Sequence, residues 1–242
     1  MKYFLTLIFF ASALNSFGQD TTFYNNDFGE VSAMNEATYY EVVIRDPADT
    51  NRAQMKSYDV SGQLKSEENY SDYPKKKRDG KFRSWYESGQ LHTVIDYKNG
   101  FMFGQILTYW ENGQPKRIDN YYDGKFVDGK CLTSTGADTV HFAYEIMPQY
   151  PGGIDALWKY LSHEIRYPRQ SKLDGITGRV VVGFVVDADG TISNVKIVRS
   201  VADDLDQESI RVVKSMRPWE PGMQDGKRVR VQFNLPISFD LK

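Results

Sequence analysis

Side chains with catalytic chemistry are scattered along this 242-residue chain. The three histidines, His92, His141 and His163, fall in different predicted elements and lack the spacing of a metal site or of a nucleophile and its base. The sequence also contains no nucleophile elbow and no glycine loop of the kind that cradles phosphate. We therefore expect a protein that is not an enzyme and that has no catalytic residues, cofactor or metal ion.

Two acidic clusters have simpler explanations than catalysis. The Asp-Ala-Asp-Gly segment at residues 187–190 lacks the further ligands of a calcium loop and predicts a hairpin turn instead. Asp203, Asp204 and Asp206 precede a stretch with helical periodicity that runs to Met216. Carboxylates there would supply capping oxygens and favourable charge at a helix N-terminus.

The chemistry that the pattern favours is backbone pairing. Apolar and polar residues alternate over residues 228–240, which predicts a strand with one buried face. Pro236 has no N–H to give to a ladder, so we expect this strand at a sheet edge over at least part of its length. An open edge can accept an extended peptide as an added strand. A terminal strand that only closes a small domain has the same pattern, and both interpretations stay open here.

The elements that would position this strand form an α+β domain at residues 146–242. A helix with a buried apolar face is expected over residues 154–165, and strands over 179–187 and 191–199. A second helix at 203–216 precedes the terminal strand. The order helix, strand, strand, helix, strand predicts a three-stranded antiparallel sheet with its helices on one face. The strand at 179–187 has apolar residues on both sides, so we expect it to be either covered on both faces or central.

Residues 55–145 repeat a different pattern. Gly-Gln pairs begin at residues 62, 89 and 113, each with an aromatic residue four positions earlier and a tyrosine eight positions later. Glycine turns and the pairs Asn99-Gly100 and Asp123-Gly124 predict successive hairpins. A fixed period of this length predicts an all-β antiparallel meander. Residues 19–54 form a lead-in segment with one or two expected strands.

The first 18 residues have the composition of a secretory signal. Lys2 precedes an almost wholly apolar stretch over residues 3–14, and the Ser-Phe-Gly segment at residues 16–18 offers small residues at the positions that a signal peptidase needs. This predicts cleavage near Gly18 and export to the periplasm or cell envelope. The alternative is an uncleaved segment that anchors the chain in the inner membrane. Because 30 Lys and Arg balance 32 Asp and Glu, a nucleic acid partner is not expected.

The repeats resemble the bacterial variant of the MORN repeat. The resemblance rests on Trp-Tyr-Glu-Ser-Gly-Gln-Leu at residues 85–91 and Tyr-Trp-Glu-Asn-Gly-Gln at residues 109–114. It implies a scaffold or an interaction surface.

Residues 148–242 resemble the C-terminal domain of the TonB family. The resemblance rests on several short motifs in the right order: Tyr-Pro at 167, Gly-Arg-Val at 178, Asp-Gly at 189, Leu-Asp at 205, Trp-Glu-Pro-Gly at 219 and Val-Gln-Phe at 231. It implies that the domain captures a short segment, the TonB box, of an outer-membrane receptor as an added strand. The residues that it implies for peptide binding are Tyr167, Pro168, Arg228, Val229, Arg230, Val231, Gln232, Phe233 and Asn234.

The resemblance also implies that the domain transmits force from an inner-membrane complex to the captured receptor. This role requires an inner-membrane anchor and a long spacer, and neither is recognisable in this chain. Two hypotheses follow. The first is an envelope protein that binds an extended segment of a TonB-dependent receptor or of another envelope protein. The second is an energy-transducer subunit for receptor-mediated transport, which an uncleaved N-terminus or a partner connects to an inner-membrane motor. The sequence leaves open whether the chain forms a homodimer.

Overall fold

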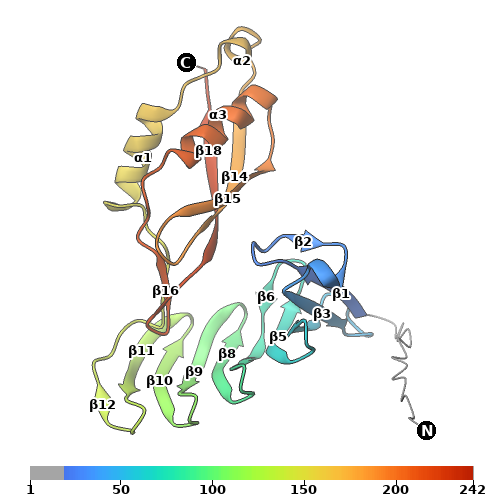
Figure 1. Ribbon diagram of the computed structural model, residues 1–242, viewed down its shortest axis with the longest axis vertical. Helices are drawn as coiled ribbons and strands as arrows, with labels where there is room; N and C mark the ends of the chain where they lie inside the picture. Colours follow the sequence, from blue (N-terminus) through green and yellow to red (C-terminus); the bar gives the residue numbers. More distant parts are fainter. Residues whose placement is uncertain (1–18, 242) are drawn as a thin grey trace, which may run out of the picture. The chain divides into compact units, whose positions relative to one another are not determined.

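The computed structural model describes residues 19–241, which divide between His141 and Phe142 into two compact units (Figure 1). We call them the repeat unit and the C-terminal unit. The expected signal peptide lies in residues 1–18, outside the described part of the chain. Within residues 19–241, every helix is too short or too polar to cross a membrane.

The repeat unit is one antiparallel sheet, which has twelve strands among the described residues. From β3 onward, strands that are consecutive in sequence are mostly neighbours in the sheet, so the chain forms the expected meander; β1 lies between β3 and β2, and β6 pairs with β5. The strands are β1 (Gln19–Tyr24), β2 (Glu30–Val31), β3 (Tyr39–Arg45), β4 (Ala53–Asp59), β5 (Leu64–Asp72), β6 (Lys77–Arg78), β7 (Gly80–Trp85), β8 (Leu91–Lys98), β9 (Phe101–Tyr109), β10 (Pro115–Tyr122), β11 (Lys125–Leu132) and β12 (Asp138–Thr139).

The hairpin turns agree with the sequence pattern. Asn99 and Gly100 join β8 to β9 with φ of 55° and 91°, and Asp123 and Gly124 join β10 to β11 with φ of 49° and 73°. Two successive positive φ values define the type I′ turn, whose twist matches that of the flanking strands. At the other end of β8, in the turn that joins β7 to β8, Gly89 supplies the expected positive φ of 82°.

The lead-in segment contributes more strands than the sequence indicates. The strands β1, β2 and β3 and a 3₁₀ helix, Met34–Glu36, precede Ala53, where one or two strands were expected. β1 is polar at its start and β2 has two residues, so neither shows the alternation that marks a strand. The tyrosines hold this part to the repeats, because the Tyr40 and Tyr58 rings stack at 5.2 Å across β3 and β4.

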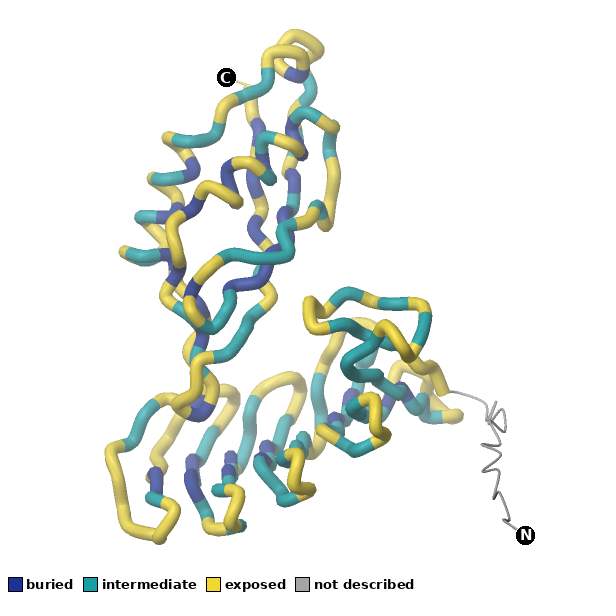
Figure 2. Tube along the Cα trace, viewed as in Figure 1, coloured by how far each residue is buried: buried dark blue, intermediate teal, exposed yellow. Residues whose placement is uncertain are grey.

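One face of the repeat sheet is buried along several successive strands, as the dark segments in Figure 2 show. Thr93, Ile95 and Ile106 are at most 2% exposed. The same face buries an ion pair between Arg117 and Asp119, both fully inaccessible to solvent.

The C-terminal unit combines helices with two small antiparallel sheets. The main sheet has the order β15-β14-β18, so β14 is central, which is one of the two positions expected for it; the second sheet has the order β13-β16-β17. Leu157 and Leu161 of α1 and Val212 and Val213 of α3 pack with β14 and β18 in one buried cluster. The elements are β13 (Glu145–Ile146), α1 (Gly153–Glu164), α2 (Arg169–Leu173), β14 (Gly178–Val186), β15 (Ile192–Arg199), α3 (Asp203–Lys214), β16 (Gly222–Gln224), β17 (Lys227–Val229) and β18 (Val231–Phe239).

This unit has the expected α+β composition, and several details differ from the prediction. The second sheet and α2 were not foreseen. The apolar face of α1 is narrower than expected, because Ile154 is 59% and Trp158 49% exposed at its margin. The N-cap of α3 is Ala202, which makes no side-chain capping bond, and Asp204 instead accepts hydrogen bonds from the backbone and hydroxyl of Ser171 in α2.

Candidate functional site

The outer strand β18 is the candidate site. It pairs with β14 over nine residues without a register shift, from Val231 opposite Val186 to Phe239 opposite Gly178. Its side chains alternate between the core and the outer surface throughout, as the sequence predicts. No strand of the described chain pairs with its other edge. A straight, regular edge of this kind is a template for an additional strand.

The opposite edge of the same sheet is irregular. The strand β15 pairs with β14 through two register shifts, and its Asn194 adopts a positive φ of 49°. Bulges of this kind bend an edge and interrupt pairing. The two edges of the sheet therefore differ, and β18 is the one that is suited to strand addition.

Pro236 fixes which backbone groups of β18 face outward. Residues of an antiparallel strand alternate between forming hydrogen bonds to one neighbour and to the other. Because Pro236 has no N–H and lies opposite Val181 in an unbroken register, we assign its backbone to the open side. The same alternation directs the N–H and C=O groups of Gln232, Asn234 and Ser238 outward, away from β14.

An aromatic cluster supports the first half of this edge. The ring of Phe233 lies 5.2 Å from that of Trp219 and 5.6 Å from that of Phe184. Trp219 also contacts Tyr150 at 5.8 Å, edge to face. Trp219 is 4% exposed, so Phe233 rests on a rigid, buried base while remaining only half-buried itself.

The turn between β14 and β15 packs beneath this cluster. The N–H of Trp219 donates to the carbonyl of Gly190 at 2.8 Å, and a Cβ at Gly190 would collide with the Trp219 carbonyl oxygen. Hydrogen bonds from the hydroxyl and the N–H of Thr191 lower the pKa of Asp189 from its ordinary value and fix the turn. The Asp-Gly turn of the sequence thus has a structural role, as predicted.

The structure brings together only part of the residue set that the sequence predicts. Val231, Gln232, Phe233 and Asn234 lie side by side on β18. Arg228 and Val229 belong to β17 of the second sheet.

Arg230 lies between the two strands. Its Nε donates to Asp187 Oδ1 at 2.6 Å, so its side chain is bonded to the end of β14.

Tyr167 and Pro168 lie at the far end of the sheet. The Tyr167 ring meets the Phe239 ring at 5.6 Å, and its hydroxyl donates to the carbonyl of Ile176. Pro168 is the N-cap of α2. Phe239 is five residues beyond Asn234, roughly 17 Å along a strand. The two residues are therefore not adjacent to the segment 231–234.

The sequence reasoning missed the hairpin that precedes β18. Asp225 and Gly226 connect β16 to β17 with φ of 48° and 80°, the same turn type as in the repeats. The Asp-Gly pair is the signal that identifies it. The hairpin pairs with β13, so the first residues of the unit are attached to the segment next to β18.

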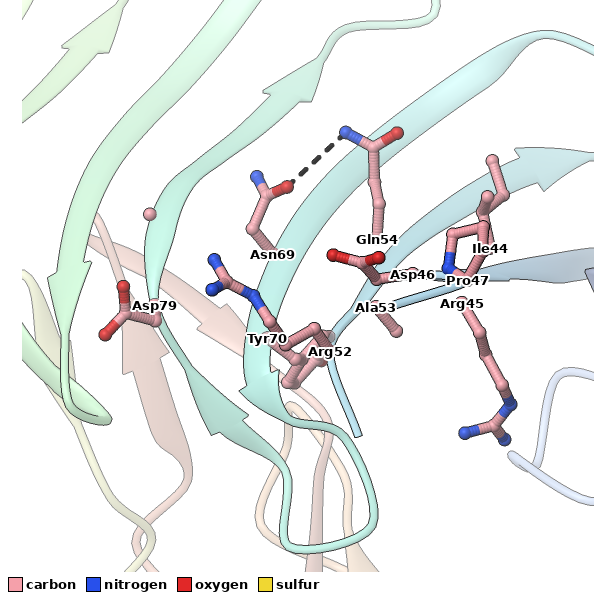
Figure 3. Close-up of a pocket in the computed structure, with 11 residues that line it drawn as sticks. Ile44, Arg45, Asp46, Pro47, Arg52, Ala53, Gln54, Asn69, Tyr70 and Asp79 are labelled. Atoms are coloured by element: carbon pink, nitrogen blue, oxygen red, sulfur yellow. Dashed lines mark hydrogen bonds between the residues drawn. The ribbon is translucent and has the colours of Figure 1, made fainter. Parts of the chain in front are cut away.

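The repeat unit contains open pockets, one of which is shown in Figure 3. Its polar groups are mostly bonded to one another or to turns. Gln54 donates to Asn69 at 3.5 Å, Arg45 pairs with Asp20, and Asp46 accepts the N–H of Ala48. These bonds position the strand ends of the sheet and do not assemble an acid, a base and a nucleophile.

A second pocket contains a charge network that also serves structure. Glu68 accepts hydrogen bonds from Arg78 at 2.7 Å and from Tyr70 at 2.6 Å. Burial raises the pKa of the Tyr70 hydroxyl, and the neighbouring Glu68 raises it further. Burial likewise raises the pKa of Glu41. Glu68, at the centre of this network, therefore has both an opposite charge and a hydroxyl beside it.

The three histidines lie apart. The His92 ring packs on Tyr86 at 4.4 Å, while His141 bonds to Asp119 and His163 to the adjacent glutamate. In residues 19–241, no three His, Cys, Asp or Glu side chains gather as ligands for a metal ion.

Comparison with known families agrees with the two resemblances. Residues 163–241 match the model of the Gram-negative bacterial TonB protein C-terminal domain, and residues 53–72 and 78–99 match the MORN repeat variant. The C-terminal unit therefore carries a TonB C-terminal domain, and MORN repeats precede it. The TonB-like family is not a family of enzymes.

The curated relatives include Protein TonB of two Helicobacter pylori strains. Each is 31% identical to this chain over 83 residues, which is 34% of the chain. The chain spans 28% of the length of these relatives.

Two solved structures are also similar, both of them NMR solution structures of the Helicobacter pylori TonB C-terminal domain. One is 25% identical, with 38% of this chain and 89% of that chain covered and a TM-score of 0.29. The other is 27% identical, with 36% and 92% covered and a TM-score of 0.30.

Proposed function

We propose that this protein is a TonB-like protein of the cell envelope whose C-terminal unit captures an extended segment of a partner protein by strand addition to β18. The partner class that the family favours is an outer-membrane receptor. Backbone hydrogen bonds would supply most of the affinity, and the side chains along the strand would supply selectivity.

The difference between the two sheet edges is the observation that carries this proposal. β18 offers nine residues in unbroken register, whereas β15 is bent by two bulges. Natural proteins usually protect long regular edges with bulges, charges or a covering element. The regular edge of β18, in the same sheet as the bulged edge of β15, is best explained by a role in binding a partner strand.

The repeat unit supports the proposal as a scaffold. Its buried face is filled by its own side chains, and its strands form a continuous sheet. Units that bury their faces only against neighbours form extended supports. We therefore assign the recognition step to the C-terminal unit and a carrying or spacing role to the repeats.

A binding titration tests the proposal. Peptides from the N-terminal segments of the host's TonB-dependent receptors are added to the ¹⁵N-labelled full chain, and backbone amide shifts are followed. We expect saturable shifts confined to β18 and the residues beside it. Saturable binding that shifts only amides of the repeat unit would contradict the proposal, as would a well-dispersed spectrum that no peptide alters.

A further inference from the structure

We propose that the repeat unit contains a site for the ammonium group of a lysine side chain of a partner protein, and that the chain's own Lys76 occupies this site until the partner binds. The site is the pocket around Glu68, which is formed by β3, β4, β5 and the turn that follows β5. Its volume is about 500 Å³, and its lining includes Glu41, Met55 and Tyr70. This inference goes beyond the proposed function, because it adds a ligand to the unit that serves there only as a scaffold.

Two tyrosine rings supply a surface that attracts a cation. The rings of Tyr70 and Tyr73 meet edge to face, with their centroids 5.2 Å apart. The ammonium of Lys76 lies 3.7 Å from the Tyr73 centroid and 5.7 Å from the Tyr70 centroid. Both distances are within the range of a cation–π interaction. Tyr70 is 6% exposed, so this wall of the pocket is fixed.

The carboxylate of Glu41 supplies a charge that lacks a close partner. Glu68 already has Arg78 and the Tyr70 hydroxyl beside it. Within the described chain, by contrast, no hydrogen bond or ion pair reaches the Glu41 carboxylate. Burial raises the pKa of Glu41, and the charge of Lys76 offsets only part of this effect. A ligand ammonium within hydrogen-bond distance of Glu41 would stabilise the charged form of this carboxylate further.

Lys76 is held weakly enough to leave the site. It is exposed, and its ammonium forms no hydrogen bond or ion pair with any residue that the structure describes. Arg45 also lies over the Tyr73 ring, at 5.3 Å, but hydrogen bonds to Asp20 and to the carbonyl of Thr50 hold it in place. Of these two cations, Lys76 is therefore the one that an incoming ammonium can displace.

The backbone of Lys76 is an independent argument. Its φ is +52°, and its N–H donates to the carbonyl of Tyr73 at 2.9 Å in the turn after β5. Glycine and asparagine adopt this conformation at a lower cost than lysine. The presence of a long cationic side chain at this position is therefore better explained by the ring that it covers than by the turn itself.

The ligand that fits is a primary ammonium on a flexible apolar stem. Met55 and Tyr70 would contact the stem, and the ammonium would lie between Glu41 and the Tyr73 ring. A lysine side chain and a free diamine share this chemistry. We assign the site to a lysine of a protein, because the group that occupies it in this structure is itself a lysine side chain.

An NMR titration of the ¹⁵N-labelled full chain tests the site. The probes are the capped peptide acetyl-Gly-Lys-Gly-amide, the same peptide with its lysine side chain acetylated, and the diamine cadaverine. Each probe is added to the unmodified protein, to Lys76→Ala and to Lys77→Ala. Lys77→Ala is the matched control, because it removes an exposed lysine from the adjacent position. A double variant that combines Lys76→Ala with Glu41→Gln removes the negative charge and keeps the size of the side chain.

We expect the lysine peptide to shift the backbone amides of Glu41, Tyr70 and Tyr73. Lys76→Ala should bind this peptide about fivefold more tightly than the unmodified protein does, the factor that corresponds to the loss of one exposed cation–π contact. Lys77→Ala should bind like the unmodified protein. The acetylated peptide should not bind, and the double variant should lose the gain of Lys76→Ala.

Four outcomes would overturn the inference in whole or in part. Equal affinities of Lys76→Ala and Lys77→Ala would mean that Lys76 does not occupy the site. Equal binding of the acetylated peptide would mean that the pocket does not recognise an ammonium. Binding of cadaverine without the lysine peptide would retain the ammonium site and exclude a protein as its source. If no probe shifts these amides in any variant, the site does not exist. The proposed function is unaffected by all four, because it concerns β18.

Discussion

The Arg230 guanidinium donates from Nε to Asp187 Oδ1 at 2.6 Å, and this bond joins the start of β18 to the end of β14. The backbone pairing of the two strands ends one residue away, at Val231 opposite Val186. The side chains therefore extend the attachment between the strands beyond the last backbone pair. They hold the junction between β17 and β18, at the start of the strand to which we propose that the partner segment is added.

Removal of this bond should affect binding more than stability. The two side chains are 33% and 24% exposed, so we expect Asp187→Ala to lower the free energy of unfolding by about 1 kcal/mol or less. The free energy of peptide binding should become weaker by more than this amount, because the junction is no longer fixed before the peptide binds. Asp96→Ala, which breaks the exposed pair with Lys81 in the repeat unit, is the control and should leave the affinity unchanged. Unaltered affinity in Asp187→Ala would show that the junction needs no fixation.

Gly190 should tolerate no larger residue. Its φ is +90°, and a Cβ would collide with the carbonyl oxygen of Trp219. Gly89 has a similar φ of +82° and no atom within 4 Å of the Cβ position, so Gly89→Ala carries the backbone strain without the collision. We expect Gly190→Ala to lower the free energy of unfolding by more than about 1 kcal/mol and by more than Gly89→Ala. Equal losses in urea unfolding would mean that the turn moves away from Trp219 at little cost.

The strand β18 was predictable because one signal determines it. The alternation of apolar and polar residues over nine positions is visible in the sequence and does not depend on distant contacts. Pro236, which stands at one of the outward-facing positions, indicates a sheet edge. The repeat hairpins were predictable for a similar reason, since Asn-Gly and Asp-Gly pairs select a turn type locally. In both cases the information lies within a few residues of the feature.

The break at Arg230 was not predictable from the alternation. The pattern continues through Val229 and Val231, so residues 228–240 read as one strand with one neighbour. The structure gives that segment two successive neighbours, β16 and then β14, and the change depends on where distant strands end. The position of Tyr167, packed on Phe239 instead of near Asn234, is tertiary information of the same kind.

The ion pair of Arg117 and Asp119 should be essential for the repeat unit. Both side chains are fully buried, and Nη1 lies 2.6 Å from Oδ2. Removing one partner leaves an uncompensated charge in the interior, which typically costs about 3–5 kcal/mol. We therefore expect Asp119→Ala to unfold the repeat unit in thermal or urea unfolding, or nearly so. Asp20→Ala, which breaks an exposed pair with Arg45, is the control and should cost less than about 1 kcal/mol. Similar losses in the two variants would contradict this assignment.

The bond between α2 and α3 should depend on pH. A hydrogen bond from the Ser171 hydroxyl lowers the pKa of Asp204 from its ordinary value of 3.8. An acid whose pKa is lower in the folded state stabilises the fold above its unfolded pKa and loses this contribution as the pH falls through its folded pKa. Ser171→Ala should therefore lower Tm at pH 7, and the deficit should shrink at acid pH.

The measurement is the difference in Tm between Ser171→Ala and the unmodified protein, followed from about pH 7 to about pH 2.5, the range over which a carboxyl of this type takes up its proton. Ser162→Ala is the control, since the Ser162 hydroxyl donates to the carbonyl of Lys159 and to no carboxylate. Its deficit should be the same at both ends of the range. A Ser171→Ala deficit that is also constant would mean that the hydroxyl stabilises the buried position of Ser171 by packing alone, without favouring the charged form of Asp204.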